Sequence, residues 1–110
     1  MKIFNPEQAV IPFEKLEGYS LNPNHPEGKH KALVFQSALG INLDNANDLR
    51  IELKEVLKEK EAIATSLSQY GQKYQLDFEM TRNQKTAVVR SIWIVRSGES
   101  FPRLITCYIL

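Results

Sequence analysis

The sequence predicts an α+β domain in which two helices pack on a small antiparallel sheet of three to four strands. Apolar residues recur at helical spacing through residues 26–64, whereas they alternate with polar residues in the last third of the chain. The expected strands are joined by short turns, which favours antiparallel pairing because parallel strands need long crossovers. With 110 residues, of which 43% are hydrophobic and 25% charged, the chain fits a single α+β domain over residues 1–110.

The first helix is expected over residues 26–40. Proline is favoured at the first helical position and glycine just after the last, and Pro26 and Gly40 occupy these places. Between them, apolar residues follow the i, i+3, i+6, i+7 pattern of one buried face. The members of this face are Ala32, Phe35, Ala38 and Leu39.

The second helix is expected to begin at Asp44, an acidic residue suited to the N-cap position. Its apolar residues follow helical spacing, so the helix has one buried stripe and one solvated, charged face. The stripe consists of Leu49, Leu53, Val56, Leu57 and either Ile63 or Ala64.

Three strands are expected after the break at residues 70–71, where the apolar period changes to two. They cover residues 74–80, 87–96 and 104–110. Residues 10–13 suit a short strand at the edge of a sheet, because the proline within them cannot donate a hydrogen bond to a neighbouring strand. The three later strands form an antiparallel meander, and the two helices are expected to cover one of its faces.

The charged residues nearly balance, which leaves a formal net charge of +1. No global field therefore steers the protein onto nucleic acid or an anionic membrane, and any anion binding must come from a local cluster. The single cysteine, Cys107, lies in an apolar run and is expected to be a buried, inert thiol. The sequence contains no signal peptide and no apolar stretch of membrane-spanning length, so we expect a cytoplasmic protein without a membrane partner.

Residues 21–35, LNPNHPEGKHKALVF, place a cluster of cationic side chains where the first helix is expected to begin. The N–H groups there carry about half a positive charge, so each cation costs on the order of 0.3–1 kcal/mol. A local rule broken in this way is often found where function demands it, and N–H groups beside cations can bind phosphate or sulfate. A glycine in the same turn would let such an anion approach the backbone. The residues of this candidate site are His25, Gly28, Lys29, His30 and Lys31.

A structural interpretation of the same residues is also open. Lysines are common on exposed helical positions, and a histidine between asparagine and proline can serve only to cap a turn. The aliphatic part of the Lys31 side chain can pack along the core while its amine reaches water.

A second candidate lies on the central expected strand, where Arg90 and Arg96 share one face and Trp93 points to the other. The structural interpretation is an ion pair with Asp77 or Glu79 on the neighbouring strand. The functional interpretation is an open sheet surface on which Arg90 or Arg96 binds phosphate through its rigid fork. Trp93 fits the core better than a base-stacking platform.

The sequence contains no pattern typical of a metal or cofactor site. His25 and His30 are five residues apart, which differs from the i, i+4 spacing of a helical metal pair. No Gly-x-Ser-x-Gly elbow, Walker loop or dinucleotide fingerprint is present. We therefore expect no metal, no cofactor and no covalent nucleophile.

Four segments carry a family resemblance: LNPNHPEGKHKALVFQSALGI, YGQKYQLDFEM, VVRSIWIV and PRLITCYIL. In order and spacing they resemble a bacterial family of similar size that has only a domain-of-unknown-function name, with the signature LNPxHPxGKHKAxVF. The family is notably cyanobacterial, as short stand-alone proteins, and also occurs at the C-terminal ends of larger toxin-like proteins. The resemblance runs over residues 10–110 and implies no established activity.

The residues leave open whether the protein is an enzyme. The first hypothesis is a binding or partner-interaction module with an anion site at the helix start, as in a toxin–antitoxin-like pair. The second follows from a looser resemblance to metal-independent ribonuclease toxins. In that case His25 or His30 would be the general base, while Lys29, Lys31 and Arg90 would stabilise charge on the phosphate of RNA. The near-neutral charge and the absence of histidine in the strands count against it. The third is a structural module that forms a homodimer through its exposed sheet face.

Overall fold

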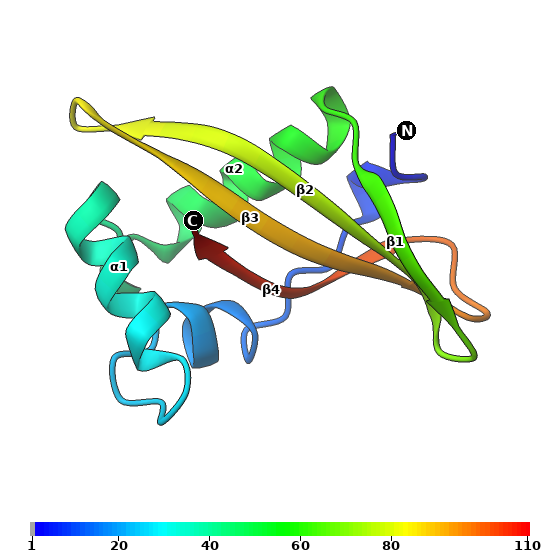
Figure 1. Ribbon diagram of the computed structural model, residues 1–110, viewed down its shortest axis with the longest axis horizontal. Coiled ribbons are helices and arrows are strands. Elements are labelled where there is room, and N and C mark those ends of the chain that lie inside the picture. Colours follow the sequence, from blue (N-terminus) through cyan, green and yellow to red (C-terminus); the bar gives the residue numbers. More distant parts are fainter. Residues whose placement is uncertain (1) are drawn as a thin grey trace.

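The computed structural model describes residues 2–110 as an α+β fold in which helices pack against a four-stranded antiparallel sheet (Figure 1). This confirms the predicted fold class. No helix in this part of the chain has the length and apolar character needed to cross a membrane. The elements in chain order are η1 (Pro6–Gln8), η2 (Leu16–Ser20), α1 (Lys29–Leu39), η3 (Leu43–Asn45), α2 (Ala46–Glu59), β1 (Ile63–Ser68), β2 (Gly71–Arg82), β3 (Lys85–Arg96) and β4 (Pro102–Ile109).

The sheet is a meander with the strand order β1-β2-β3-β4. Its centre is the long β2–β3 hairpin, whose register runs from Gly71 opposite Arg96 to Arg82 opposite Lys85. The two turn residues, Asn83 and Gln84, both have positive φ, at 52° and 66°. Such a two-residue turn matches the right-handed twist of the strands that it joins, so the hairpin register is fixed locally.

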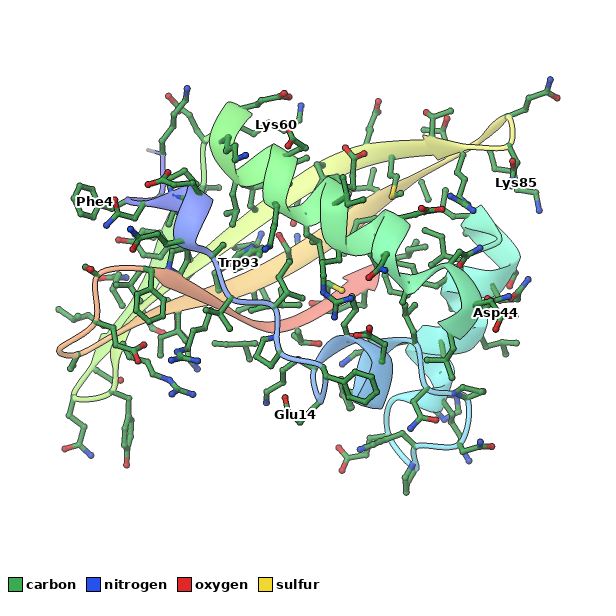
Figure 2. The ribbon with its side chains drawn as sticks, turned by 180° about the vertical axis from the view of Figure 1, so that it is seen from behind. Phe4, Glu14, Asp44, Lys60, Lys85 and Trp93 are labelled. Carbon is green, nitrogen blue, oxygen red and sulfur yellow. The ribbon has the colours of Figure 1, made fainter. Side chains whose placement is uncertain are left out.

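The core lies between α2 and one face of the sheet, as Figure 2 shows from the helix side. Trp93 is fully buried there, and its Nε1 donates to the Ser91 hydroxyl at 2.9 Å. That hydroxyl donates in turn to the Leu76 carbonyl at 2.7 Å. Both buried polar groups are thus satisfied, and the prediction that Trp93 belongs to the core is confirmed.

The helix stripes are largely as predicted, but the start of the second helix differs. Leu49, Leu53, Val56 and Leu57 are buried on α2, and Gly40 ends α1 in the left-handed conformation, with φ of 66°. The prediction that Asp44 caps the second helix is wrong, because Asp44 lies within η3 and Asn45 precedes α2. The capping box of η3 belongs to Asn42, whose side chain accepts from the Asp44 N–H.

The strand β1 was not expected from the sequence, which assigned Ile63 or Ala64 to the helix stripe. Both residues instead belong to β1 and pair with β2. The expected strand at residues 10–13 is reduced to a single bridge, in which Val10 pairs with Arg103 of β4. A bidentate ion pair between Glu17 and Arg50 of α2, with one N–O distance of 2.9 Å, fixes the turn η2 against the helix.

Candidate functional site

The imidazole of His25 closes the turn that leads into α1. Its Nδ1 accepts the N–H groups of Glu27 and Gly28 at 3.0 and 2.9 Å, and its carbonyl accepts the Lys29 N–H at 3.0 Å. Nδ1 is therefore the unprotonated nitrogen, and Nε2 carries the hydrogen of the neutral ring. Two of the N–H groups proposed to bind an anion are already bonded to this side chain. The regular helix begins at Lys29, three residues after the expected start.

Gly28 is required by packing rather than by an approaching ligand. A Cβ atom at this position would lie 2.1 Å from the Tyr19 carbonyl oxygen and 2.8 Å from its carbon. The backbone of η2 thus occupies the space beside Gly28 in which an anion was predicted to bind. This is a correction to the proposed role of Gly28, because its N–H group donates to His25 and its α-carbon contacts Tyr19.

Lys31 is the centre of a cluster of polar and aromatic side chains. Its Nζ donates to the Tyr19 hydroxyl at 2.6 Å and to Thr106 Oγ1 at 3.5 Å. The same ammonium lies 4.3 Å from the Tyr19 ring centroid and 5.3 Å from that of Tyr108. The His25 ring meets the Tyr19 ring edge to face, with centroids 4.9 Å apart. Three separate segments, η2, the start of α1 and β4, therefore converge on one ammonium group.

This cluster borders a hollow of about 400 Å³, which we call the polar hollow. It lies beside β4, on the side where the N-terminal segment and the start of α1 approach the sheet (Figure 1). One exposed carboxylate, that of Glu14, belongs to its wall, and Figure 2 labels this residue in the coil before η2. The lining residues are Glu14, Lys15, Tyr19, His25, Lys31, Ile105 and Thr106.

Arg90 lies next to this cluster on the sheet. It stands opposite Tyr108 of β4 and opposite Asp77 of β2. Its guanidinium donates two parallel hydrogen bonds of 2.9 Å to the Asp77 carboxylate. That carboxylate, and after it the Tyr108 hydroxyl, raises the pKa of Arg90 well above its ordinary value. The ion pair foreseen as the structural interpretation of Arg90 is present.

The remaining predicted residues lie elsewhere. Lys29 and His30 are exposed and line a second, larger hollow of about 540 Å³ between α1 and η3. The walls of this apolar hollow are mainly hydrocarbon, from Leu21, Pro23, Ala32, Leu33 and Leu43. Arg96 is exposed at the end of β3. The hydrogen bond from Arg103 holds the pKa of Glu99 below its ordinary value, and the charge of Arg96 adds a smaller effect in the same direction. The structure thus brings His25 and Lys31 together with Arg90 nearby, and places Lys29, His30 and Arg96 apart from them.

Sequence reasoning missed six residues of the polar hollow and its border: Glu14, Lys15, Tyr19, Ile105, Thr106 and Tyr108. Thr106 and Tyr108 lie two residues apart in the last predicted strand and so share one of its faces, which is the one signal that the sequence offers. The contacts that join the cluster span 12 and 75 residues of sequence. Separations of this size follow from tertiary packing and leave no local motif.

Cys107 is fully buried on β4, and this burial raises its pKa to about 12. The expectation of a buried thiol is confirmed. Within residues 2–110, no three His, Cys, Asp or Glu side chains are grouped closely enough to hold a metal ion.

Fold and site together define a small α+β domain with a cationic, hydroxyl-rich hollow beside one edge of its sheet. The chain belongs to the family described as Domain of unknown function (DUF6883), whose model matches residues 2–110. A search of the curated proteins finds no match. Among solved structures, the fold is similar to a chain of a contact-dependent growth inhibition toxin–immunity protein complex from Klebsiella pneumoniae 342. The TM-score is 0.71 at 18% sequence identity, and the match covers 92% of this chain and 99% of that chain.

Proposed function

We propose that the protein is a toxin-like, metal-independent ribonuclease whose active site is the polar hollow. One observation carries the proposal: the Lys31 ammonium is held among Tyr19, Thr106 and Tyr108 at the edge of an open hollow, with Arg90 adjacent on the sheet. Cations and hydroxyl donors fixed around one space are what a phosphodiester transition state requires. Two likenesses support this proposal. The fold is similar to one chain of a toxin–immunity complex, and residues 10–110 resemble a family that also occurs at the C-terminal ends of toxin-like proteins.

The geometry favours a different assignment of roles from that expected from the sequence. The basic nitrogen of His25 is occupied by the helix turn, so His25 would donate from Nε2 to a phosphate oxygen rather than take a proton. The carboxylate of Glu14 is the remaining group in the hollow that can accept the proton of a ribose 2′-hydroxyl. The 2′-oxygen would then attack phosphorus and form a 2′,3′-cyclic phosphate.

Departure of the 5′-oxygen requires a proton and a stabilised negative charge. The Tyr19 hydroxyl can donate that proton, because Lys31 lies 2.6 Å from its oxygen and would stabilise the phenolate that remains. Lys31 would also stabilise the equatorial phosphate oxygens, together with Arg90. Released product would have a 2′,3′-cyclic phosphate at one end and a 5′-hydroxyl at the other.

The test is cleavage of RNA in the presence of EDTA, with mapping of the ends produced. The wild type is expected to leave 2′,3′-cyclic phosphates and to spare a position that carries 2′-deoxyribose. Lys31→Met and Glu14→Gln are each expected to lower the rate by at least about 100-fold, the usual effect of losing one transition-state contact or proton acceptor.

Lys29→Met is the matched control, because Lys29 lies two residues away on α1 and lines the other hollow. Its rate is expected to stay within about threefold of the wild type, as for a side chain that makes no contact in the polar hollow. No cleavage by the wild type, or equal losses in Lys29→Met and Lys31→Met, would reject the ribonuclease assignment.

A second function, binding of a partner protein at the apolar hollow, is supported by a separate observation. Leu33 and Leu43 on its walls are 67% and 45% exposed, which is unusual for two large aliphatic side chains beside one cavity. Lys29 and His30 at the same hollow favour a partner that presents an apolar side chain flanked by carboxylates. Such a partner would be a protein encoded beside this one, as in a toxin–antitoxin-like pair.

Binding of that neighbouring protein, measured by calorimetry with purified components, tests the second function. Leu33→Lys and Lys29→Glu are expected to weaken binding at least about tenfold, while Lys31→Met leaves it unchanged. Wild-type affinity in both hollow variants would show that the partner binds elsewhere.

A further inference from the structure

The outer edge of β1 is the open edge of the sheet. All six residues of β1 are exposed, and among residues 2–110 only β2 pairs with it. The Ser66 carbonyl, at the point where the pairing with β2 is irregular, accepts a hydrogen bond from the Gln72 side chain at 3.1 Å. The backbone groups that face outward along the rest of β1 present the hydrogen-bonding pattern of a strand that lacks a neighbour.

The side chains of β1 do not protect this edge in the usual way. Natural edge strands commonly carry lysine, other charges or proline, which discourage pairing with another chain. The sequence of β1, IATSLS, contains none of these. Its two large aliphatic side chains, Ile63 and Leu67, are 67% and 77% exposed. The irregularity between Ala64 and Leu67 is the one feature that weakens an added ladder.

The opposite edge of the sheet is already covered. Val10 donates to the Pro102 carbonyl at 2.9 Å and accepts the Leu104 N–H at 2.9 Å. Farther along β4, the Ser20 hydroxyl donates to the Cys107 carbonyl at 2.8 Å. A copy of this chain can therefore add a strand at β1 but not at β4. Edge-to-edge association then stops at two copies instead of continuing into a fibre.

We propose that β1 pairs antiparallel with β1 of a second copy of this chain, which joins two sheets into one of eight strands. Pairing about a two-fold axis brings no like charges together, because β1 is uncharged and the whole chain has a net charge of only +1. The unpaired backbone of β1 can bind an extended strand. Because β1 has no charged residue that would repel its own copy, we take that strand to be β1 of a second copy. Figure 1 shows β4 at the edge of the sheet opposite β1. The polar hollow is lined by Ile105 and Thr106 of β4, so the dimer leaves it open.

The dimer is expected to be weak. Six residues per copy is well below the 20–30 residues per side of a standard interface, so we expect a dissociation constant on the order of 100 µM. Sedimentation equilibrium of the full chain at protein concentrations between about 5 and 500 µM, on both sides of the expected dissociation constant, measures this association. Ile63→Lys and Leu67→Lys, which place a charge on each face of the edge strand, are expected to weaken the dimer at least about tenfold.

Leu33→Lys is the control, because Leu33 on α1 is as exposed as Ile63 and lies away from β1. A second measurement on the wild type does not depend on any variant. Amide hydrogen exchange in residues 63–68 should slow as the protein concentration rises, while exchange in residues 29–39 stays constant. Three results would each overturn the proposal. The first is a wild type that is monomeric at 500 µM, about five times the expected dissociation constant. The second is exchange in residues 63–68 that does not depend on protein concentration, and the third is a dimer that Leu33→Lys abolishes while the β1 variants leave it intact. None of these results bears on RNA cleavage, so the two proposals fail independently.

Discussion

Replacement of His25 tests whether its imidazole serves as a cap for the turn before α1. His25→Ala removes the acceptor of the Glu27 and Gly28 N–H groups and the edge-to-face contact with Tyr19. Loss of a capping side chain costs about 0.5–2 kcal/mol, and an aromatic pair contributes about 0.5–1.5 kcal/mol. We expect the free energy of unfolding to fall by about 2 kcal/mol, which lowers Tm by roughly 8 °C in a domain of this size.

His25→Asn separates the cap from any role of the ring. Asparagine is among the best capping residues, so its side-chain oxygen can accept the same N–H groups without an imidazole. We expect His25→Asn to recover about half of the stability lost in His25→Ala, measured by urea unfolding with the fluorescence of buried Trp93 as the signal. If His25→Ala is as stable as His25→Asn, the capping argument is wrong. RNA cleavage should fall at least about tenfold in both variants, because both lack the Nε2 donor.

Three other predictions follow from buried or tightly packed groups. The hydrogen bond from Arg50 holds the pKa of Glu17 below its ordinary value. This carboxylate therefore stabilises the fold fully above roughly pH 5, and less as the pH falls through the lowered pKa. In Glu17→Gln the free energy of unfolding should fall less steeply below that pH than in the wild type. Gly28→Ala should cost about 1–3 kcal/mol in chemical unfolding because the added Cβ would collide with the Tyr19 carbonyl. Gly18→Ala should cost less than about 0.5 kcal/mol, because its Cβ would lie 3.5 Å from the Phe13 carbonyl oxygen, an ordinary contact. The Cys107 thiol, with its pKa raised by burial to about 12, should react with a disulfide reagent at pH 8 only after urea unfolds the chain, and rapid labelling of the native protein would contradict the structure.

The helices and strands with a strong period of apolar residues could be predicted from the sequence, whereas the exposed strand β1 could not. The stripe of α2 and the alternation along β2 each reflect one buried face, which is what a periodic pattern measures. The residues of β1 are exposed on both faces, so no alternation marks them as a strand. Ile63 and Ala64 also continue the helical spacing of the preceding stripe. Pairing with β2, a tertiary effect, therefore decides their conformation.

Only part of the predicted site segment lines the proposed site, the polar hollow. His25 and Lys31 lie in the predicted segment and reach the polar hollow. The structural interpretation, in which the histidine between asparagine and proline caps a turn, describes what the His25 imidazole does in the structure. Sequence rules name Ser, Thr, Asp and Asn as the usual capping residues, so they do not identify which N–H groups the imidazole accepts. The partners of Lys31 come from η2 and β4, whose approach depends on the packing of the whole N-terminal segment against the sheet.

The two lysines at the start of α1 are best understood as belonging to different surfaces. Residues two apart on an α-helix are separated by about 200° around its axis, so Lys29 and Lys31 project in nearly opposite directions. Lys29 therefore lines the apolar hollow, and Lys31 the polar one. His25 already accepts two of the N–H groups in the turn before α1. The two lysines therefore do not form, together with those N–H groups, one positively charged site that requires a bound anion. The single cationic cluster of the sequence is thus divided between two hollows. For this reason we expect Lys31→Met to lower RNA cleavage without affecting partner binding, and Lys29→Glu to weaken partner binding.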